Sequence, residues 1–391
     1  MRAVACLLLL SACVEDDEAV MEATMAALDA AVPIDAALVA DAIVEAAAAS
    51  PDADFDWQLP AHFPRPRVPD DNPMTNAKVE LGRHLFYDTR LSITGTHSCA
   101  SCHEQARAFT DGRATGLGAT GVHHPRGASS LANVAYNQTL AWANPLLTTL
   151  EQQLLVPLLG DDPVELGMRS IPQVEQVVRA IPRYRALFDA AFPGHVESIT
   201  MTHLQRALAS FERSLISARS PYDRYLQGAT LSEAALRGMR LVTTDQDARF
   251  ACHRCHGGFA FSDHVTWEGK PVQSAAFHQT GLYDVDGEGA YPAPNTGVHE
   301  LSFEDADMGL FRAPTLRNVA LTAPYMHDGS LATLEDVLDH YARGGRAHSA
   351  RTDPLLQPFA LGDGEKRDVI EFLQSLTDEA LRIDPRFANP W

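Results

Sequence analysis

Two copies of one short cysteine pattern constrain this chain more than any other feature of its sequence. Residues Cys99–His103 and Cys252–His256 both read Cys-x-x-Cys-His, which is the pattern for covalent attachment of haem c. Two thiols at this spacing reach both vinyl groups of one porphyrin, and the adjacent histidine gives the iron an axial nitrogen. The sequence therefore predicts two haem c groups, bound by Cys99, Cys102 and His103 and by Cys252, Cys255 and His256.

The alternative for these cysteines is a single zinc site with four cysteine ligands. The two cysteine pairs lie about 150 residues apart, whereas the pairs of a compact zinc site are roughly 12–20 residues apart. A zinc site would also leave the histidine after each pair without a role. We therefore prefer two haem sites to one zinc site.

The N-terminus has the features of an export signal. Arg2 precedes a short apolar run, and Leu10–Cys13 resembles a bacterial lipobox. This resemblance implies a signal peptide over residues 1–12 and a lipid on the Cys13 thiol. The alternatives are an ordinary signal peptide or a buried apolar N-terminus. No apolar run approaches the roughly 18–20 residues of a membrane span. We therefore expect a lipoprotein of the periplasm, outer membrane or cell surface, held to the membrane only by its anchor.

Residues 13–56 differ in composition from the rest of the chain. They are rich in alanine, and residues 14–56 contain twelve acidic residues and no Lys or Arg. Low complexity and charge of one sign favour a tether behind the lipid anchor over a folded domain. The whole chain has a formal net charge of −20, and no basic patch indicates a nucleic-acid partner.

Helical periodicity dominates the remainder, which is too long for one ordinary core. We expect a mostly α fold with two cytochrome-c-like haem domains, residues 57–225 and 226–391, and long haem-covering loops. In each domain a helix should precede the cysteine motif and a later helix should pack on it. The expected helices are Asn76–Tyr87, Leu150–Leu159, Val174–Ala191, Thr202–Ser217, Ser232–Leu241, Thr333–Tyr341 and Glu365–Leu376.

Two longer segments resemble a known family. Glu80–Ser92, followed by the first cysteine motif, and Phe311–Gly329 are similar to bacterial di-haem cytochrome c peroxidases, a family that includes MauG. The segments Trp57–Pro69, Trp142–Pro145 and Thr280–Tyr283 look most like its MbnH subgroup. The family resemblance implies a reaction with hydrogen peroxide. The subgroup resemblance implies partnership with a copper-binding, MbnP-like protein in which a tryptophan is oxidised.

The resemblance also implies roles for residues around the first haem. His103 would be the proximal ligand of the haem that reacts with peroxide. Glu165, in the segment Pro163–Gly167, matches the distal glutamate and would move a proton between the two peroxide oxygens. Gln153 would be a second distal group. The alternatives are a surface acid for Glu165 and a helix-surface amide for Gln153.

Some family members close the first haem at rest with a histidine from the following loop. His123 and His124 lie in that loop, but neither falls on the family's ligand position. We therefore expect a permanently open first haem, as in MauG. The plain alternative for both histidines is an exposed position in the loop.

The resemblance further implies a charge relay and a second haem ligand. Trp142 matches the family tryptophan between the haems, and its alternative is a buried core residue. Tyr341 falls where cytochrome c peroxidases have a methionine opposite the proximal histidine, here His256. Methionine raises the reduction potential, whereas a hard phenolate should stabilise oxidised iron. The alternative is that Tyr341 only packs and that the ligand is Met308 or Met326.

The family also binds calcium between its haems. The carbonyl groups of the residues that match Thr322 and Pro324 contribute, together with an asparagine side chain. This chain has Gly127 at the asparagine position. Calcium is therefore implied, but with one family ligand missing.

These features lead to one main functional hypothesis and two alternatives. The main one is a hydrogen-peroxide-dependent di-haem oxidoreductase that stores high-valent iron and oxidises an aromatic residue, a tryptophan, of a partner protein. The first alternative is a cytochrome c peroxidase that reduces hydrogen peroxide with electrons from a small cytochrome c. The second is a non-enzymatic di-haem electron carrier.

Overall fold

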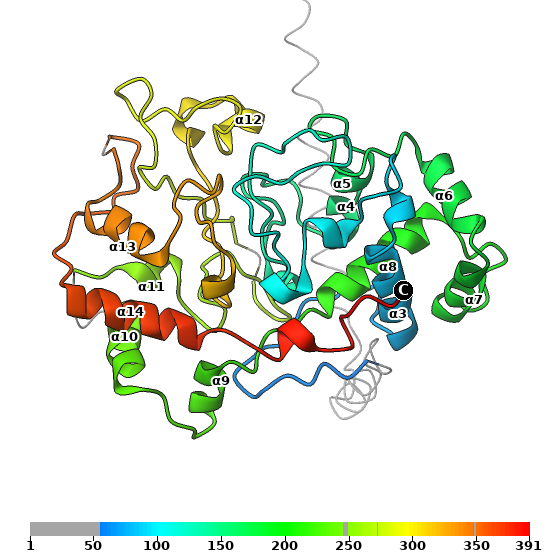
Figure 1. The fold of residues 1–391 in the computed structure, drawn as a ribbon, viewed down its shortest axis with the longest axis horizontal. Helices are drawn as coiled ribbons and strands as arrows, with labels where there is room; N and C mark the ends of the chain where they lie inside the picture. The colour runs from blue at the N-terminus through cyan, green and yellow to red at the C-terminus, as the bar shows by residue number, and fades with distance from the viewer. Residues whose placement is uncertain (1–54, 245–248, 272, 348) are drawn as a thin grey trace, which may run out of the picture. The chain divides into compact units, whose positions relative to one another are not determined.

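Helices joined by long loops make up the part of the chain that the computed structural model describes (Figure 1). It describes residues 55–244, 249–271, 273–347 and 349–391. The predicted signal peptide, Cys13 and nearly all of the tether lie outside these residues. Within them there is no strand, only isolated β-bridges, and no helix is long and apolar enough to cross a membrane. The expectation of a mostly α fold is confirmed.

The helix before the first cysteine motif packs on a later helix. Helix α3 (Asn76–Phe86) begins after Thr75, whose side chain accepts the N–H of Lys78. It packs against α8 (Met201–Arg213). A Cβ atom on Gly82 would lie 2.0 Å from a backbone oxygen of α8. The two helices can therefore approach this closely only because residue 82 is glycine.

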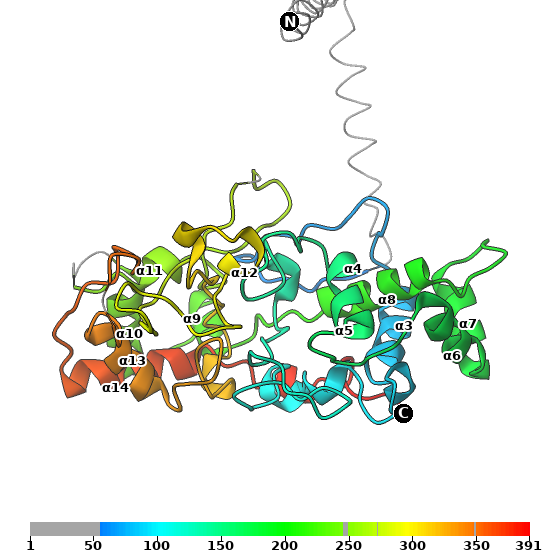
Figure 2. The ribbon, with the colours of Figure 1, turned by 90° about the horizontal axis from the view of Figure 1, so that it is seen from above.

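A matching pair of helices, one before and one after it in the chain, accompanies the second cysteine motif. Helix α10 (Glu233–Thr243) packs along α14 (Asp363–Ser375), and both views show the two helices side by side (Figures 1 and 2). A Cβ atom on Gly238 would lie 1.9 Å from the carbonyl oxygen of Asp368. Each half therefore has the expected arrangement, and in each a glycine lets the helices meet.

Most of the other helices follow the predicted segments with two interruptions. The single helix predicted over Val174–Ala191 is wrong, because the backbone of Ile181 is extended before Pro182 and a new helix starts there. The segment Leu150–Leu159 is likewise divided at Leu154. The remaining α-helices are α4 (Leu150–Gln153), α5 (Leu155–Leu159), α6 (Ile171–Arg179), α7 (Pro182–Ala191), α9 (Pro221–Leu226), α11 (Cys252–Cys255), α12 (His299–Ser302) and α13 (Leu334–Ala342). The short helices α9, α11 and α12 lie in none of the predicted segments. The 3-10 helices are Thr89–Leu91, Cys99–Ser101, Gln105–Arg107, Val134–Tyr136, Asp305–Asp307, Val319–Leu321 and Leu381–Ile383.

Two large hydrophobic cores accompany the two helix pairs. One is built from residues between 81 and 215, and the other from residues between 242 and 376. Leu381 and Phe387, near the C-terminus, return to the first core. The proposed division at residues 225 and 226 does not include this return, and the division itself stays a prediction.

Candidate functional site

The two cysteine motifs hold their histidines in the same way. His103 Nδ1 donates a hydrogen bond to the carbonyl of Phe109 at 2.8 Å, and His256 Nδ1 donates to the carbonyl of Phe261 at 3.2 Å. Both acceptors have left-handed backbones, with φ of 61° and 50°. Burial lowers the pKa of both histidines, which keeps the rings neutral. Each ring therefore leaves Nε2 free for a metal, so both sites fit a haem iron.

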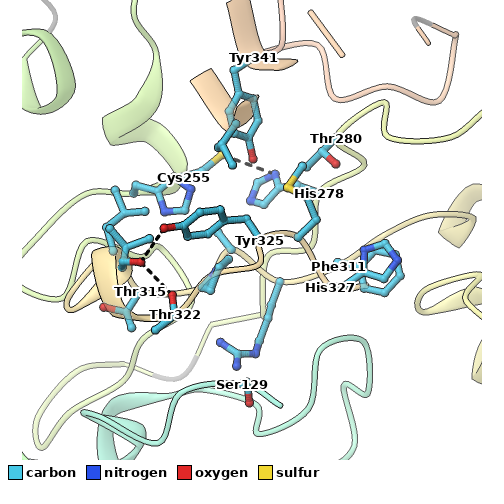
Figure 3. A pocket seen from close by; sticks show the side chains of 18 of the residues that line it. Ser129, Cys255, His278, Thr280, Phe311, Thr315, Thr322, Tyr325, His327 and Tyr341 are labelled. Atoms are coloured by element: carbon cyan, nitrogen blue, oxygen red, sulfur yellow. Dashed lines mark hydrogen bonds between the residues drawn. The ribbon is translucent and has the colours of Figure 1, made fainter. Parts of the chain in front are cut away.

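One cavity of about 270 Å³ contains most of the predicted second site (Figure 3). The Tyr341 hydroxyl is directed toward Cys255 and His278. Met326 also lines the cavity, whereas Met308 does not. Tyr341 and Met326 therefore remain the two ligand candidates opposite His256. The predicted residues that line the cavity are Trp142, Cys252, Cys255, His256, Thr322, Pro324 and Tyr341.

Tyr341 lies near the end of α13, among buried groups. Burial raises the pKa of its phenol, and the nearby thiols Cys255 and Cys252 raise it further. A phenolate would therefore form here only beside a cation, and haem iron would supply one. The hydroxyl has the position and the chemistry of an iron ligand.

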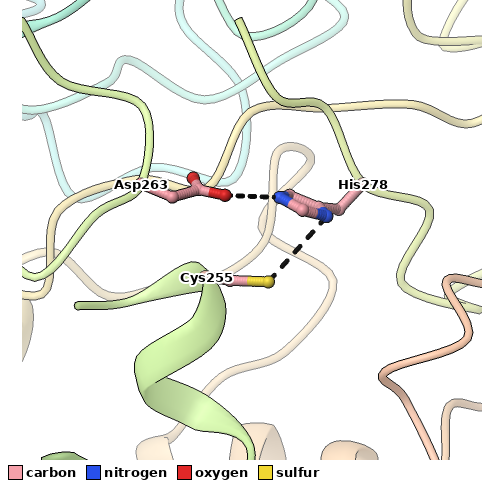
Figure 4. A group of neighbouring side chains, drawn as sticks. All are labelled: Cys255, Asp263 and His278. Carbon is pink, nitrogen blue, oxygen red and sulfur yellow. Dashed lines mark hydrogen bonds and ion pairs between the residues drawn. The ribbon is translucent and has the colours of Figure 1, made fainter.

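A histidine that the sequence did not single out lies next to Cys255 (Figure 4). His278 Nε2 is 2.8 Å from a carboxylate oxygen of Asp263, and Nδ1 is 2.6 Å from one of Asp353. The bond to Asp263 is the largest cause that raises the pKa of His278 to about 11. Both ring nitrogens are therefore occupied by carboxylates, and His278 has no lone pair for a separate metal with Cys255 and Asp263.

Trp142 has a fixed orientation in the cavity. Its Nε1 donates to the carbonyl of Gly127 at 2.9 Å. The guanidinium of Arg312 lies 5.4 Å from the indole centroid. Burial lowers the pKa of Arg312 to about 10, and no carboxylate of the described residues forms an ion pair with it. No pattern in the sequence predicts this contact, because it depends on which loop crosses the tryptophan.

The region of the expected calcium contains a buried carboxylate in addition to the expected carbonyl groups. Thr322 and Pro324 line the cavity, but Gly127 has no side chain to offer, and its carbonyl already accepts the Trp142 indole. Asp111 lines the same cavity, and its Oδ2 is buried without a hydrogen-bond partner. The donor set therefore contains an uncompensated carboxylate oxygen, which fits a hard cation.

Glu165 is held by the loop that follows the first cysteine motif. Its carbonyl accepts the N–H of Ala119 at 2.6 Å. Burial raises the pKa of its carboxyl to about 7. His124 Nε2 lies 3.9 Å from Glu165 Oε1. His124 is half-buried and His123 is exposed, so the exposed position considered for both loop histidines describes only His123.

The position of Gln153 does not by itself indicate a role. It is the last residue of α4 and half-buried. Among the hydrogen bonds of the described residues, none joins its side chain to Glu165. Its distal role stays a prediction.

Comparison with known proteins identifies the family. Residues 76–231 match the family described as di-haem cytochrome c peroxidase. The chain is also 33% identical to the methylamine utilization protein MauG of Methylorubrum extorquens over 332 residues, which cover 83% of this chain and 86% of that protein. This chain belongs to the di-haem cytochrome c peroxidase and MauG family.

Solved structures agree with this assignment. A MauG-like protein associated with microbial copper homeostasis is 48% identical, with a TM-score of 0.83, over 86% of this chain and 99% of its own. The diheme peroxidase BthA from Burkholderia thailandensis is 21% identical, with a TM-score of 0.61, over 86% and 90%, and shares the fold. The predicted fold class, the family, and the enzyme class, a di-haem peroxidase-type oxidoreductase acting with hydrogen peroxide, are confirmed. Two haem c groups are characteristic of this family.

Proposed function

We propose that this protein uses hydrogen peroxide to oxidise a tryptophan side chain of a partner protein and stores two oxidising equivalents across its two haem sites. The observation that carries the proposal is Tyr341, whose hydroxyl enters the cavity lined by Cys252, Cys255 and His256. A phenolate ligand favours oxidised iron, whereas a methionine favours reduced iron and exchange with a small cytochrome.

The first haem iron, when bound, supplies the two-electron reaction with peroxide. Glu165 takes the proton from one peroxide oxygen and returns it to the other, since its pKa near 7 suits both steps. The peroxide takes up two electrons and two protons and leaves as two waters. The electrons come from the partner's indole. Trp142, fixed by its bond to Gly127, lies on the proposed path between the two sites.

The partner and the location form the second part of the proposal. The 48% identical neighbour is named for microbial copper homeostasis, which supports a copper-binding, MbnP-like partner. Two covalent haems and the lipobox-like segment before Cys13 support an exported lipoprotein of the periplasm or cell surface. The proposal also includes a calcium ion, which would be bound by the carbonyl groups of Thr322 and Pro324 and by Asp111 in place of the missing asparagine.

A cytochrome c peroxidase is the second candidate. The chain is 31% identical to the cytochrome c551 peroxidase of Nitrosomonas europaea over 270 residues. Met326 lines the same cavity as Tyr341 and would be its methionine ligand. This candidate needs an electron-donating cytochrome, whereas the first does not.

The test is the optical and EPR spectrum of the haem-loaded protein before and after one equivalent of peroxide, without reductant. We expect one high-spin and one low-spin haem at rest and a long-lived oxidised species after peroxide. Adding a copper-binding partner from the same organism should discharge that species. Mass spectrometry should then find an oxidised tryptophan. Reaction only after prior reduction by a small cytochrome would favour the second candidate. An unreactive protein would be an electron carrier.

A further inference from the structure

A small hairpin lies between the first cysteine motif and Glu165. Its two arms are joined by hydrogen bonds from Gly118 N–H to Val122 at 2.8 Å and from His124 N–H to Gly116 at 2.8 Å. The carbonyl of Leu117, in the first arm, is 3.9 Å from Cys102 Sγ. The hairpin (residues 116–124) therefore contacts the first haem attachment point.

The same hairpin is docked on the segment that carries Glu165. Ala119 N–H donates to the Glu165 carbonyl at 2.6 Å. A Cβ atom on Gly118 would lie 1.8 Å from the carbonyl oxygen of Val164 and 3.3 Å from that of Glu165. Contact this close fixes Glu165 relative to the last residue of the hairpin, His124.

The orientation of the His124 ring follows from its backbone neighbour. The N–H of Arg126 donates to His124 Nδ1 at 3.1 Å. Nδ1 is therefore an acceptor, and the neutral ring carries its proton on Nε2. That N–H is on the atom that lies 3.9 Å from Glu165 Oε1, which is longer than a formed hydrogen bond, so the hydrogen bond itself is part of what is proposed.

We propose that His124 is a positioning residue for Glu165 and not an iron ligand: its Nε2–H holds the carboxylate that moves the peroxide proton at the first haem. An iron ligand needs an unprotonated ring nitrogen that faces the metal, and the only such nitrogen of His124 is occupied by Arg126. The inference rests on the proposed role of Glu165 and does not depend on the partner protein.

Among the hydrogen bonds and ion pairs of the described residues, the side chain of Glu165 has one partner, His124. The Arg126 side chain turns to the second half of the chain, where Nε donates to Asn295 Oδ1 at 2.8 Å and Nη2 pairs with Glu300. Burial and Arg126 lower the pKa of His124, so the ring is neutral at pH 7. The other charged groups of the region are Asp111 and Arg113 beside Cys102, and the exposed Asp161 and Asp162 that precede Glu165.

The test compares three variants of the haem-loaded protein. His124→Phe removes the N–H donor, His124→Gln replaces it with an amide N–H, and His123→Gln changes the exposed neighbour as a matched control. Infrared difference spectroscopy, with Glu165→Gln to identify the band, follows the Glu165 carboxyl as a function of pH. A lost hydrogen bond to the ionised form should raise the titration midpoint by about one pH unit in His124→Phe. His124→Gln should restore most of that shift, and His123→Gln should show none.

The rate of the peroxide reaction should follow the same midpoints. Below both midpoints, His124→Phe should react about tenfold more slowly than the parent protein, because the reactive carboxylate is about tenfold rarer. An unchanged midpoint in His124→Phe would overturn the proposal. So would a low-spin first haem in the parent that becomes high-spin in the variant, because His124 would then be an iron ligand. His124→Leu serves if the phenylalanine variant does not fold. If the parent protein does not react with peroxide, the proposed function is wrong. The infrared titration would still decide the role of His124.

Discussion

The guanidinium of Arg317 binds both carboxylate oxygens of Asp223, with two N–O distances of 2.9 Å, and both side chains are completely buried. His62 and Ser220 also bind this carboxylate. Arg317 Nε donates to the carbonyl of Phe259 at 2.7 Å. The pair therefore fixes the turn that follows His256. His256 Nδ1 donates its own hydrogen bond to the carbonyl of Phe261 in the same turn.

Replacement of Arg317 by methionine should destabilise the protein by about 3–5 kcal/mol, because Asp223 would remain buried as an unpaired charge. Chemical denaturation measures this loss. Arg237→Met is the matched control, since Arg237 makes a similar bidentate pair with Asp368 but is 53% exposed. Its loss of stability should be much smaller, because an exposed ion pair is screened by solvent and each partner stays hydrated when the other is removed. Equal losses in the two variants would contradict the prediction.

Glu165→Gln should slow the peroxide reaction by about 10²–10⁴-fold, the usual contribution of a general acid or base. Burial raises the pKa of Glu165 to about 7, and the first proton must be accepted by the carboxylate. The parent rate should therefore rise with pH through about 7 and level off above it, whereas the variant should lack this rise. Stopped-flow absorbance measures both, with the exposed Asp161→Asn as a control. A variant with the parent's pH profile would exclude Glu165.

Tyr341→Phe separates the two ligand candidates of the second haem. If the phenol is the ligand, its removal should convert the low-spin EPR signal of that haem to high spin. Tyr325→Phe is the control, because Tyr325 lines the same cavity but its hydroxyl donates to the Val319 carbonyl at 3.2 Å. An unchanged spectrum in Tyr341→Phe would assign the position to Met326.

Gly118→Ala should disturb the reaction with peroxide without removing any chemical group. The added Cβ would lie 1.8 Å from the Val164 carbonyl oxygen and would displace the segment that carries Glu165. At Gly116 the corresponding atom would meet the His124 Cβ at 3.6 Å and the Arg126 carbonyl oxygen at 3.9 Å, which are both ordinary contacts. We expect a slower peroxide reaction in Gly118→Ala and a nearly normal one in Gly116→Ala. Equal rates would show that the hairpin does not set the position of Glu165.

Trp142→Phe should slow the exchange of oxidising equivalents between the two haems, because phenylalanine is harder to oxidise than tryptophan. Time-resolved absorbance after peroxide addition would show the delay at the second haem. Trp267→Phe is a matched control, since Trp267 packs in a separate hydrophobic cluster with Phe259. A delay of equal size in the control would point to a general packing defect.

Several features of this protein are determined by residues close together in the sequence. The spacing within Cys99–His103 and within Cys252–His256 is local chemistry, and it predicts the haem sites without a fold. Helices α3, α8, α10, α13 and α14 follow from apolar periodicity. The break before Pro182 also follows from a local rule, because proline disfavours helix in the residue before it. Apolar periodicity alone predicts one continuous helix there.

The resemblance to a family indicates Glu165, Trp142 and Tyr341, whereas no pattern in the sequence predicts the side chains that surround them. Arg312 over Trp142, Asp353 and Asp263 on His278, and Arg317 on Asp223 join residues far apart in the chain. His124 illustrates the difference best, because the sequence places it in a glycine-rich loop beside an identical neighbour. Only the docking of the hairpin through Gly118 and Ala119 turns His124 toward Glu165 and leaves His123 exposed. Spacing and periodicity are set by covalent neighbours, whereas such contacts depend on how distant loops pack.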